Sequence, residues 1–141
     1  MKKPYKHLVQ YYETDQMGIV HHSNYIRWFE EARSYLLEEM GFGYKKMEQC
    51  GIISPVLSIR AEYKSMTHYY DTVVIDVNVV KYNGVKIILE YIVKDEKTGE
   101  IRCVGESKHC FLDSSGHPVS IKRELPELNE LFIGMADKNE N

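Results

Sequence analysis

The chain has 141 residues, of which 43% are hydrophobic and 28% are charged. This length and balance favour one globular domain with its own core, and they exclude disorder as the main state. The net charge of -3 excludes a global field that would draw the chain to nucleic acid, and no apolar run is long enough to span a membrane.

The first elements expected along the chain are a short strand and a long helix. We expect the strand over His7–Glu13 and the helix over Ser23–Met40, with Ser23 or Asn24 as the N-terminal cap and Gly41 as the left-handed residue after the end. The apolar face has helical spacing and consists of Tyr25, Trp28, Phe29, Ala32, Leu36, Leu37 and Met40. The opposite face consists of Arg27, Glu30, Glu31, Arg33, Ser34, Glu38 and Glu39.

The rest of the chain reads as strands joined by tight turns. Alternation of apolar and polar residues predicts strands over 57–64, 73–80, 85–93 and 101–112. Asn83-Gly84 is a strong hairpin signal, so consecutive strands are expected to be antiparallel. We predict an α+β fold in which one long helix is wrapped by an antiparallel sheet of five or six strands. Residues 1–141 would form one domain, with 118–141 a polar C-terminal tail carrying a short helical turn near Leu125–Phe132.

Polar groups able to do chemistry concentrate between the first strand and the helix. The segment holds two carboxylates and two histidines: Glu13, Asp15, His21 and His22. Gly18 allows a tight turn between them. A carboxylate here would face a helix N-terminus, which offers unpaired N–H groups and a partial positive charge. Such a pair suits a nucleophile or base beside an oxyanion site.

This segment carries a family resemblance. Its motif reads Asp15-Gln-Met-Gly18-Ile-Val-His21-His22-Ser-Asn24-Tyr25, then Trp28-Phe29-Glu30 and Ala32-Arg33. It resembles the signature of hot-dog-fold acyl-CoA thioesterases, in the 4-hydroxybenzoyl-CoA thioesterase-like family that includes Tol–Pal-associated members. The resemblance continues through Tyr69-Tyr70-Asp71-Thr72-Val73 and covers about residues 5–115. It implies a hot-dog fold and hydrolysis of an acyl-CoA to a free acid and CoA.

The resemblance also implies catalytic roles. Asp15 matches the catalytic carboxylate, which acts either as nucleophile or as general base. The N–H of His22 matches the oxyanion donor, its side chain matches a positioning histidine, and Tyr11 matches a tyrosine near the site. Two alternatives stay open: that Asp15 only makes an Asx turn before Gly18, and that the His22 side chain only packs locally. Glu30 lies on the helix on which other hot-dog enzymes carry a catalytic acid, although a solvated glutamate is the default.

For substrate and CoA binding we select residues of the motif and of the turn after the second strand. They are Gly18, Asn24, Tyr25, Arg60, Lys64, Ser65, Met66 and Thr67, with His68 and Lys108 as weaker candidates. Coenzyme A carries phosphates, so basic residues are expected at its site, although a solvated strand face explains them almost as well. We expect no metal site, because adjacent histidines rarely face one ion.

Two other functions remain open: a hot-dog dehydratase or hydratase, and a non-catalytic acyl-CoA-binding module. The resemblance implies no metal or redox cofactor, and it implies a site shared between subunits. We therefore expect a homodimer at minimum and a homotetramer as the further assembly, with no stable membrane insertion and no nucleic-acid partner. The three cysteines form no CxxC pair and the first residues lack an apolar signal segment, so a cytoplasmic location is expected.

Overall fold

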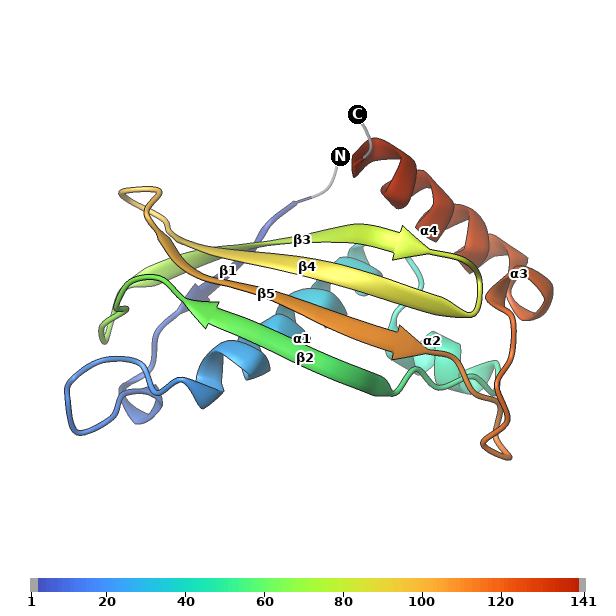
Figure 1. The fold of residues 1–141 in the computed structure, drawn as a ribbon, viewed down its shortest axis with the longest axis horizontal. Coiled ribbons are helices and arrows are strands. Elements are labelled where there is room, and N and C mark those ends of the chain that lie inside the picture. Colours follow the sequence, from blue (N-terminus) through green and yellow to red (C-terminus); the bar gives the residue numbers. More distant parts are fainter. Residues whose placement is uncertain (1–2, 140–141) are drawn as a thin grey trace.

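One long helix lies against a face of a curved antiparallel sheet (Figure 1). In this computed structural model, which describes residues 3–139, helix α1 spans Ser23–Glu39 and the sheet has the order β1-β3-β4-β5-β2. The strands are β1 (Tyr5–Leu8), β2 (Val56–Tyr63), β3 (Thr72–Tyr82), β4 (Lys86–Asp95) and β5 (Ile101–Cys110). All neighbouring strands pair antiparallel. The predicted α+β architecture is confirmed, with five strands.

Helix α1 buries the apolar face that its periodicity predicts, with Trp28 and Phe29 fully enclosed. The ring of Phe29 lies against β5 at Gly105. A Cβ atom on Gly105 would overlap that ring and lie 2.8 Å from the carbonyl oxygen of Arg60, so only glycine fits there. After the helix, Gly41 has φ +82° and its N–H donates a 3.0 Å hydrogen bond to Glu38, which confirms the expected end.

The predicted first strand is shorter than expected and shifted toward the N-terminus. Strand β1 ends at Leu8, and Tyr11–Glu13 form a turn of 3₁₀ helix instead. The N–H of Glu13 bonds the carbonyl of Gln10 at 3.0 Å, so the chain turns where alternation predicted an extended backbone. Because of this turn, the side chain of Glu13 points into the protein and is buried.

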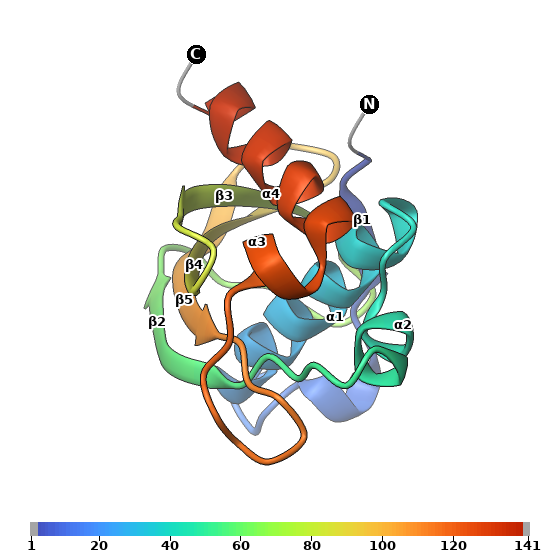
Figure 2. The same cartoon turned by 90° about the vertical axis from the view of Figure 1, so that its right-hand side faces the viewer.

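The segment predicted to be a polar tail is a packed part of the fold. It forms α3 (Ile121–Glu124) and α4 (Pro126–Asn139), which lie across the end of the sheet where β3 ends (Figures 1 and 2). Leu128 and Phe132 are buried, and burial of such side chains stabilises a fold by about 1.5–3 kcal/mol each. The tail prediction was wrong: apolar residues are few in this segment, but α4 brings Leu128 and Phe132, four positions apart, onto one face that packs on the rest of the fold. Residues 140–141 of that prediction lie outside the described chain.

Arg33 is a further difference from the predicted pattern. The helical spacing put it on the polar face of α1, whereas the structure buries it between α1 and the sheet. Its guanidinium donates to the hydroxyls of Tyr44, in α2 (Tyr44–Gln49), at 2.7 Å and of Tyr91 at 2.9 Å. These hydroxyls satisfy the hydrogen-bonding needs of the buried guanidinium. They come from residues distant in the chain, so the periodicity of the helix sequence does not predict them.

Candidate active site

The loop between β1 and α1 is a tight turn that begins at Asp15. Thr14 and Val20 form an antiparallel bridge, and the N–H of Asp15 donates to the carbonyl of Ile19 at 2.8 Å. Gly18 closes the turn with φ +79°, a backbone angle that a side chain would disfavour. One carboxylate oxygen of Asp15, Oδ1, accepts the N–H of Met17 at 2.8 Å. Asp15 therefore does make the Asx turn that the sequence left open.

Asp15 also lines a cavity of about 430 Å³, which we call the Asp15 cavity. It is a surface cavity, bordered by the loop, the start of α1 and the end of β2. Its walls are Asp15, Met17, Ile19, Val20, His22, Tyr25, Tyr63, Lys64, Ser65 and Met66. Six residues selected from the sequence are thus brought together: Asp15, His22, Tyr25, Lys64, Ser65 and Met66.

His22 lies at the junction of the loop and α1. Its carbonyl oxygen accepts the hydroxyl of Tyr63 at 3.3 Å, and its ring stacks on that of His21 with centroids 4.1 Å apart. Neither predicted cap is used: the N–H of Ser23 bonds Nδ1 of His21 at 3.2 Å, and Asn24 turns its side chain inward. The N–H of His22 has no hydrogen bond to the part of the chain that the structure describes.

The other selected residues do not line the Asp15 cavity. Asn24 and Thr67 are buried beside it, where Asn24 donates to the carbonyl of Glu13 at 2.8 Å and Thr67 receives the hydroxyl of Tyr25 at 2.9 Å. Gly18 contributes only its backbone turn. Tyr11 is 77% exposed and its ring packs on that of Tyr69.

The remaining basic candidates also lie elsewhere. Arg60 is on the outer side of β2, in ion pairs with Glu62 at 2.9 Å and Glu106 at 3.6 Å. His68 and Lys108 are exposed, and His68 faces Asp71 at 3.8 Å. The cation on the cavity wall is Lys64, whose Nζ lies 3.0 Å from Glu62.

A second surface cavity, the Glu30 cavity, lies at the other end of β2. Its volume is about 390 Å³, and its lining is Glu30, Arg33, Tyr44, Glu48, Ile52, Ile53, Ser54, Pro55 and Val56. Glu30 therefore faces a different cavity from Asp15 within one chain. The acid–base pair of His22 and Glu30 that a dehydratase would need is not assembled in a single subunit.

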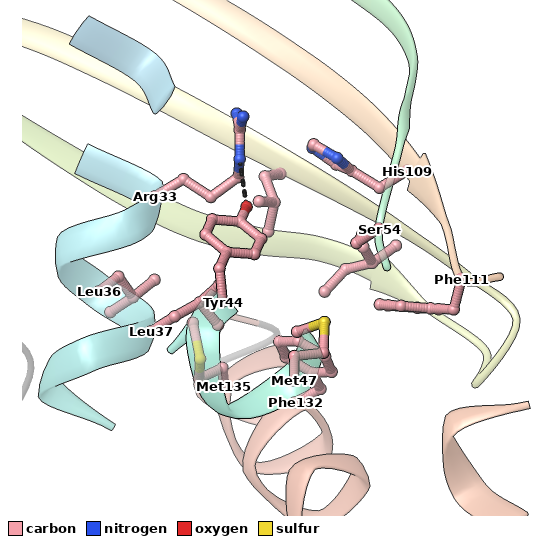
Figure 3. A pocket seen from close by; sticks show the side chains of 12 residues that line it. Arg33, Leu36, Leu37, Tyr44, Met47, Ser54, His109, Phe111, Phe132 and Met135 are labelled. Atoms are coloured by element: carbon pink, nitrogen blue, oxygen red, sulfur yellow. Dashed lines mark hydrogen bonds between the residues drawn. The ribbon is translucent and has the colours of Figure 1, made fainter. Parts of the chain in front are cut away.

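A small cavity lies between the sheet and helices α1, α2 and α4, and Figure 3 shows its lining. Its volume of about 20 Å³ holds roughly one water molecule, so it is too small for an acyl group. Its polar end belongs to a buried chain of hydrogen bonds: Arg33 to Tyr91, Tyr91 to Ser107 at 2.6 Å, and Ser107 to Nε2 of His109 at 2.7 Å. Burial, together with the nearby guanidinium of Arg33, lowers the pKa of His109 to about 4.

Glu13 is the residue near the site that the sequence left without a role. The residue is 3% exposed, and its carboxylate lies behind the Asp15 turn, between β1 and α1. Burial alone would raise its pKa, but hydrogen bonds from Gln10, His7 and Trp28 outweigh burial and keep the pKa below its usual value. The sequence signal that pointed to it was its place in the polar segment, two residues before Asp15.

Comparison with known proteins places the chain in a family. Residues 9–130 match the thioesterase-like superfamily. The chain belongs to this superfamily. A Bacillus subtilis (strain 168) protein described as a candidate acyl-CoA thioesterase, YneP, is 38% identical over 125 residues, which make up 88% of this chain and 90% of that protein. A 1,4-dihydroxy-2-naphthoyl-CoA hydrolase of Prochlorococcus marinus (strain NATL2A) is 30% identical over 103 residues, 67% of this chain and 65% of that protein.

Solved structures of thioesterases share the whole architecture. The crystal structure of DHNA-CoA thioesterase from Staphylococcus aureus has a TM-score of 0.91 and 31% identity, and the match covers 98% of this chain and 93% of that one. The predictions of a hot-dog fold and of a thioesterase enzyme are thereby confirmed. No helix within residues 3–139 is both long and apolar enough to cross a membrane.

Proposed function

We propose that this member of the thioesterase-like superfamily hydrolyses acyl-CoA thioesters in the Asp15 cavity. The observation that carries the proposal is that Asp15 and His22 line one cavity of about 430 Å³ at the start of α1. This volume falls in the range of roughly 300–1,000 Å³ that is usual for small-molecule sites. The cavity joins a carboxylate to a helix N-terminus, which is the combination that cleavage of an acyl bond needs.

In the proposed reaction, the N–H of His22 and the positive end of α1 polarise the thioester oxygen. Asp15 then acts in one of two ways. As a nucleophile, it attacks the thioester carbonyl, expels the CoA thiolate and forms a mixed anhydride that water hydrolyses. As a general base, it removes a proton from a water that attacks the carbonyl directly. Both routes yield a free acid and CoA and need no metal or redox cofactor.

We assign the nucleotide end of CoA to the turn after β2. Lys64 stands on the cavity wall beside Ser65 and Met66, and about half of its side chain is exposed, so it can exchange Glu62 for a phosphate. The acyl group would enter the apolar part of the wall, which includes Ile19, Val20 and Tyr25. Because some relatives are named for 1,4-dihydroxy-2-naphthoyl-CoA, aromatic acyl-CoAs should be tested as substrates alongside aliphatic ones.

We further propose that two copies share the site, as a homodimer at minimum. Strand β2 is an edge strand that pairs only with β5 in the described chain, and Val56 and Leu57 on it are 45% and 51% exposed. Two-fold pairing of this edge with its copy would set the Val56 end of one β2 beside the Tyr63 end of the other. Those ends border the Glu30 and Asp15 cavities, so each Asp15 cavity would be completed by the Glu30 cavity of the other copy.

We also propose a cytoplasmic location, because the free cysteines Cys50, Cys103 and Cys110 suit a reducing compartment.

The test of function is thiol release across aliphatic acyl-CoAs of increasing length and aromatic acyl-CoAs, 1,4-dihydroxy-2-naphthoyl-CoA included. Free thiol with matching free acid supports the proposal. Loss of enoyl-CoA absorbance without thiol would instead indicate a hydratase, and tight binding without turnover over hours would indicate a binding module. Light scattering on the purified chain tests the dimer, and a fully active monomer contradicts the shared site.

A further inference from the structure

Glu13 connects three elements beside the Asp15 turn. Its carboxylate accepts three hydrogen bonds: Oε1 from Nε2 of His7 at 2.7 Å and from the N–H of Gln10 at 2.8 Å, and Oε2 from Nε1 of Trp28 at 2.6 Å. His7 is in β1, Gln10 precedes the 3₁₀ turn, and Trp28 is in α1. One buried carboxylate therefore holds a strand, a turn and a helix at fixed separation.

The backbone of the same residue holds the other end of the loop. The carbonyl oxygen of Glu13 accepts the N–H of His21 at 2.9 Å and Nδ2 of Asn24 at 2.8 Å. Asp15 and His22, the two proposed catalytic positions, each lie within two residues of an atom bonded in this way. The position of Asp15 relative to the start of α1 consequently depends on how firmly Glu13 is held.

We propose that Glu13 is a positioning residue for thioester hydrolysis, one that fixes the distance from the Asp15 carboxylate to the N–H of His22. This inference rests on the proposed function. Glu13 is 3% exposed and lines none of the three cavities described above, so it acts through the loop and not on the substrate. Reacting groups must approach within about 3–3.5 Å, and a displacement of about 1 Å can lower a rate about 100-fold.

Replacement of Glu13 by glutamine tests the proposal at almost constant side-chain volume. An amide offers one acceptor oxygen, and its NH₂ group faces a donor whichever way it is turned, so at least one of the three carboxylate bonds is lost. In E13Q we expect kcat per folded enzyme to fall at least about tenfold while KM for acyl-CoA stays within about twofold, because the residues that hold the substrate are unchanged. Trp28→Phe removes only the bond to Oε2 and serves as a second variant should E13Q fold poorly.

The matched control is Tyr82→Phe. It also removes one hydrogen bond of 2.6 Å to a buried side chain, that of Asn129, but at α4 and away from the Asp15 cavity. A lower Tm with unchanged kcat is expected there. If E13Q or W28F behaves in the same way, Glu13 is only a structural residue and the proposal is overturned.

Hydrogen exchange separates this proposal from the proposed function. The amides of Asp15, Gly18 and His21 are hydrogen-bonded within the loop, and in E13Q they should exchange at least about tenfold faster while the amides of α4 keep their rates. If the wild-type enzyme releases no thiol from any thioester, the proposed function fails and exchange alone decides the role of Glu13. If the wild-type enzyme is active, unchanged exchange and unchanged kcat in E13Q overturn the positioning role alone.

Discussion

The hydroxyl of Tyr63 donates a 3.3 Å hydrogen bond to the carbonyl oxygen of His22. This contact joins the end of β2 to the start of α1, two elements that are distant in the chain. The Asp15 cavity lies between them, with Tyr63 and His22 both on its wall. The sheet edge and the helix N-terminus are thus held together at the place where we propose that the thioester binds.

Replacing Asp15 by asparagine should abolish most of the activity without unfolding the protein. The amide oxygen of asparagine can still accept the N–H of Met17, so the turn is kept, whereas the negative charge needed for attack or proton removal is lost. We expect kcat to fall at least about 100-fold. The control is Asp113→Asn, which alters a similar turn in which Oδ1 of Asp113 accepts the N–H of Ser115 at 2.9 Å, outside the Asp15 cavity. Wild-type turnover in D15N would contradict the role of Asp15.

Replacing Lys64 by alanine should weaken binding of the CoA moiety more than it slows the chemistry. Loss of one partly exposed charge contact with a phosphate corresponds to about fivefold in KM, with kcat nearly unchanged. A thioester that lacks the nucleotide, such as an acyl N-acetylcysteamine, should be hydrolysed equally by both enzymes. Lys122→Ala, on the exposed side of α3, serves as the charge-matched control. An equal KM for acyl-CoA in the wild-type and K64A enzymes would show that Lys64 does not bind the CoA moiety.

The buried His109 should make folding stability depend on pH. Its pKa is about 4 in the folded protein, below the ordinary value of 6.5, so between these values the unfolded chain binds a proton that the native state excludes. The free energy of unfolding is therefore expected to fall as the pH is lowered from about 6.5 to about 4, by up to about 3 kcal/mol from this group. Urea titrations of the wild-type protein and of His109→Gln measure this effect. If the free energy of unfolding changes equally with pH in the two proteins between pH 4 and 6.5, His109 is not the cause of the pH dependence.

The C-terminal helix should contribute to stability. Phe132 is 5% exposed and its ring packs on those of Tyr82 and Phe111, with centroids 5.2 and 6.1 Å away. Phe132→Ala is expected to lower the free energy of unfolding by about 3–5 kcal/mol, as large-to-small changes in cores do. Ile133→Ala, at a position on the same helix that is 38% exposed, should lower the free energy of unfolding much less. If both variants have the same Tm as the wild-type protein, α4 does not belong to the cooperative core.

The secondary structure followed from local patterns with few exceptions. The helix predicted over Ser23–Met40 is α1, and the hairpin expected at Asn83-Gly84 connects β3 and β4. These elements depend on periodicity and on turn residues that lie within a few positions of one another. The failures at β1 and in the C-terminal segment arose where long-range packing determines the structure. Apolar residues are few and scattered in the polar C-terminal segment, yet two of them, Ile121 and Leu128, are fully buried.

The candidate site could be predicted in its centre but not at its margins. Asp15 and His22 belong to one contiguous motif, so sequence alone pointed to them. Lys64 and Arg60 looked equivalent on one strand, whereas in the structure only Lys64 lines the Asp15 cavity and Arg60 is paired with glutamates on the outer side of the sheet. Residues 60 and 64 have the same parity and both contact Glu62, so alternation cannot separate them; what differs is that Lys64 follows the end of β2, where the cavity lies.

The sequence by itself determined the family, the order of the long helix and the strands, and the carboxylate beside the helix, because each is encoded by neighbouring residues. Tertiary structure alone decided which distant residues share a wall, that Arg33 is satisfied inside the core, and that Glu13 is enclosed by His7, Gln10 and Trp28. The physical reason is that a buried charge is stable only where hydrogen-bonding partners of the matching kind converge on it from several elements: acceptors around Arg33 and donors around Glu13. Such convergence exists only once the chain has folded.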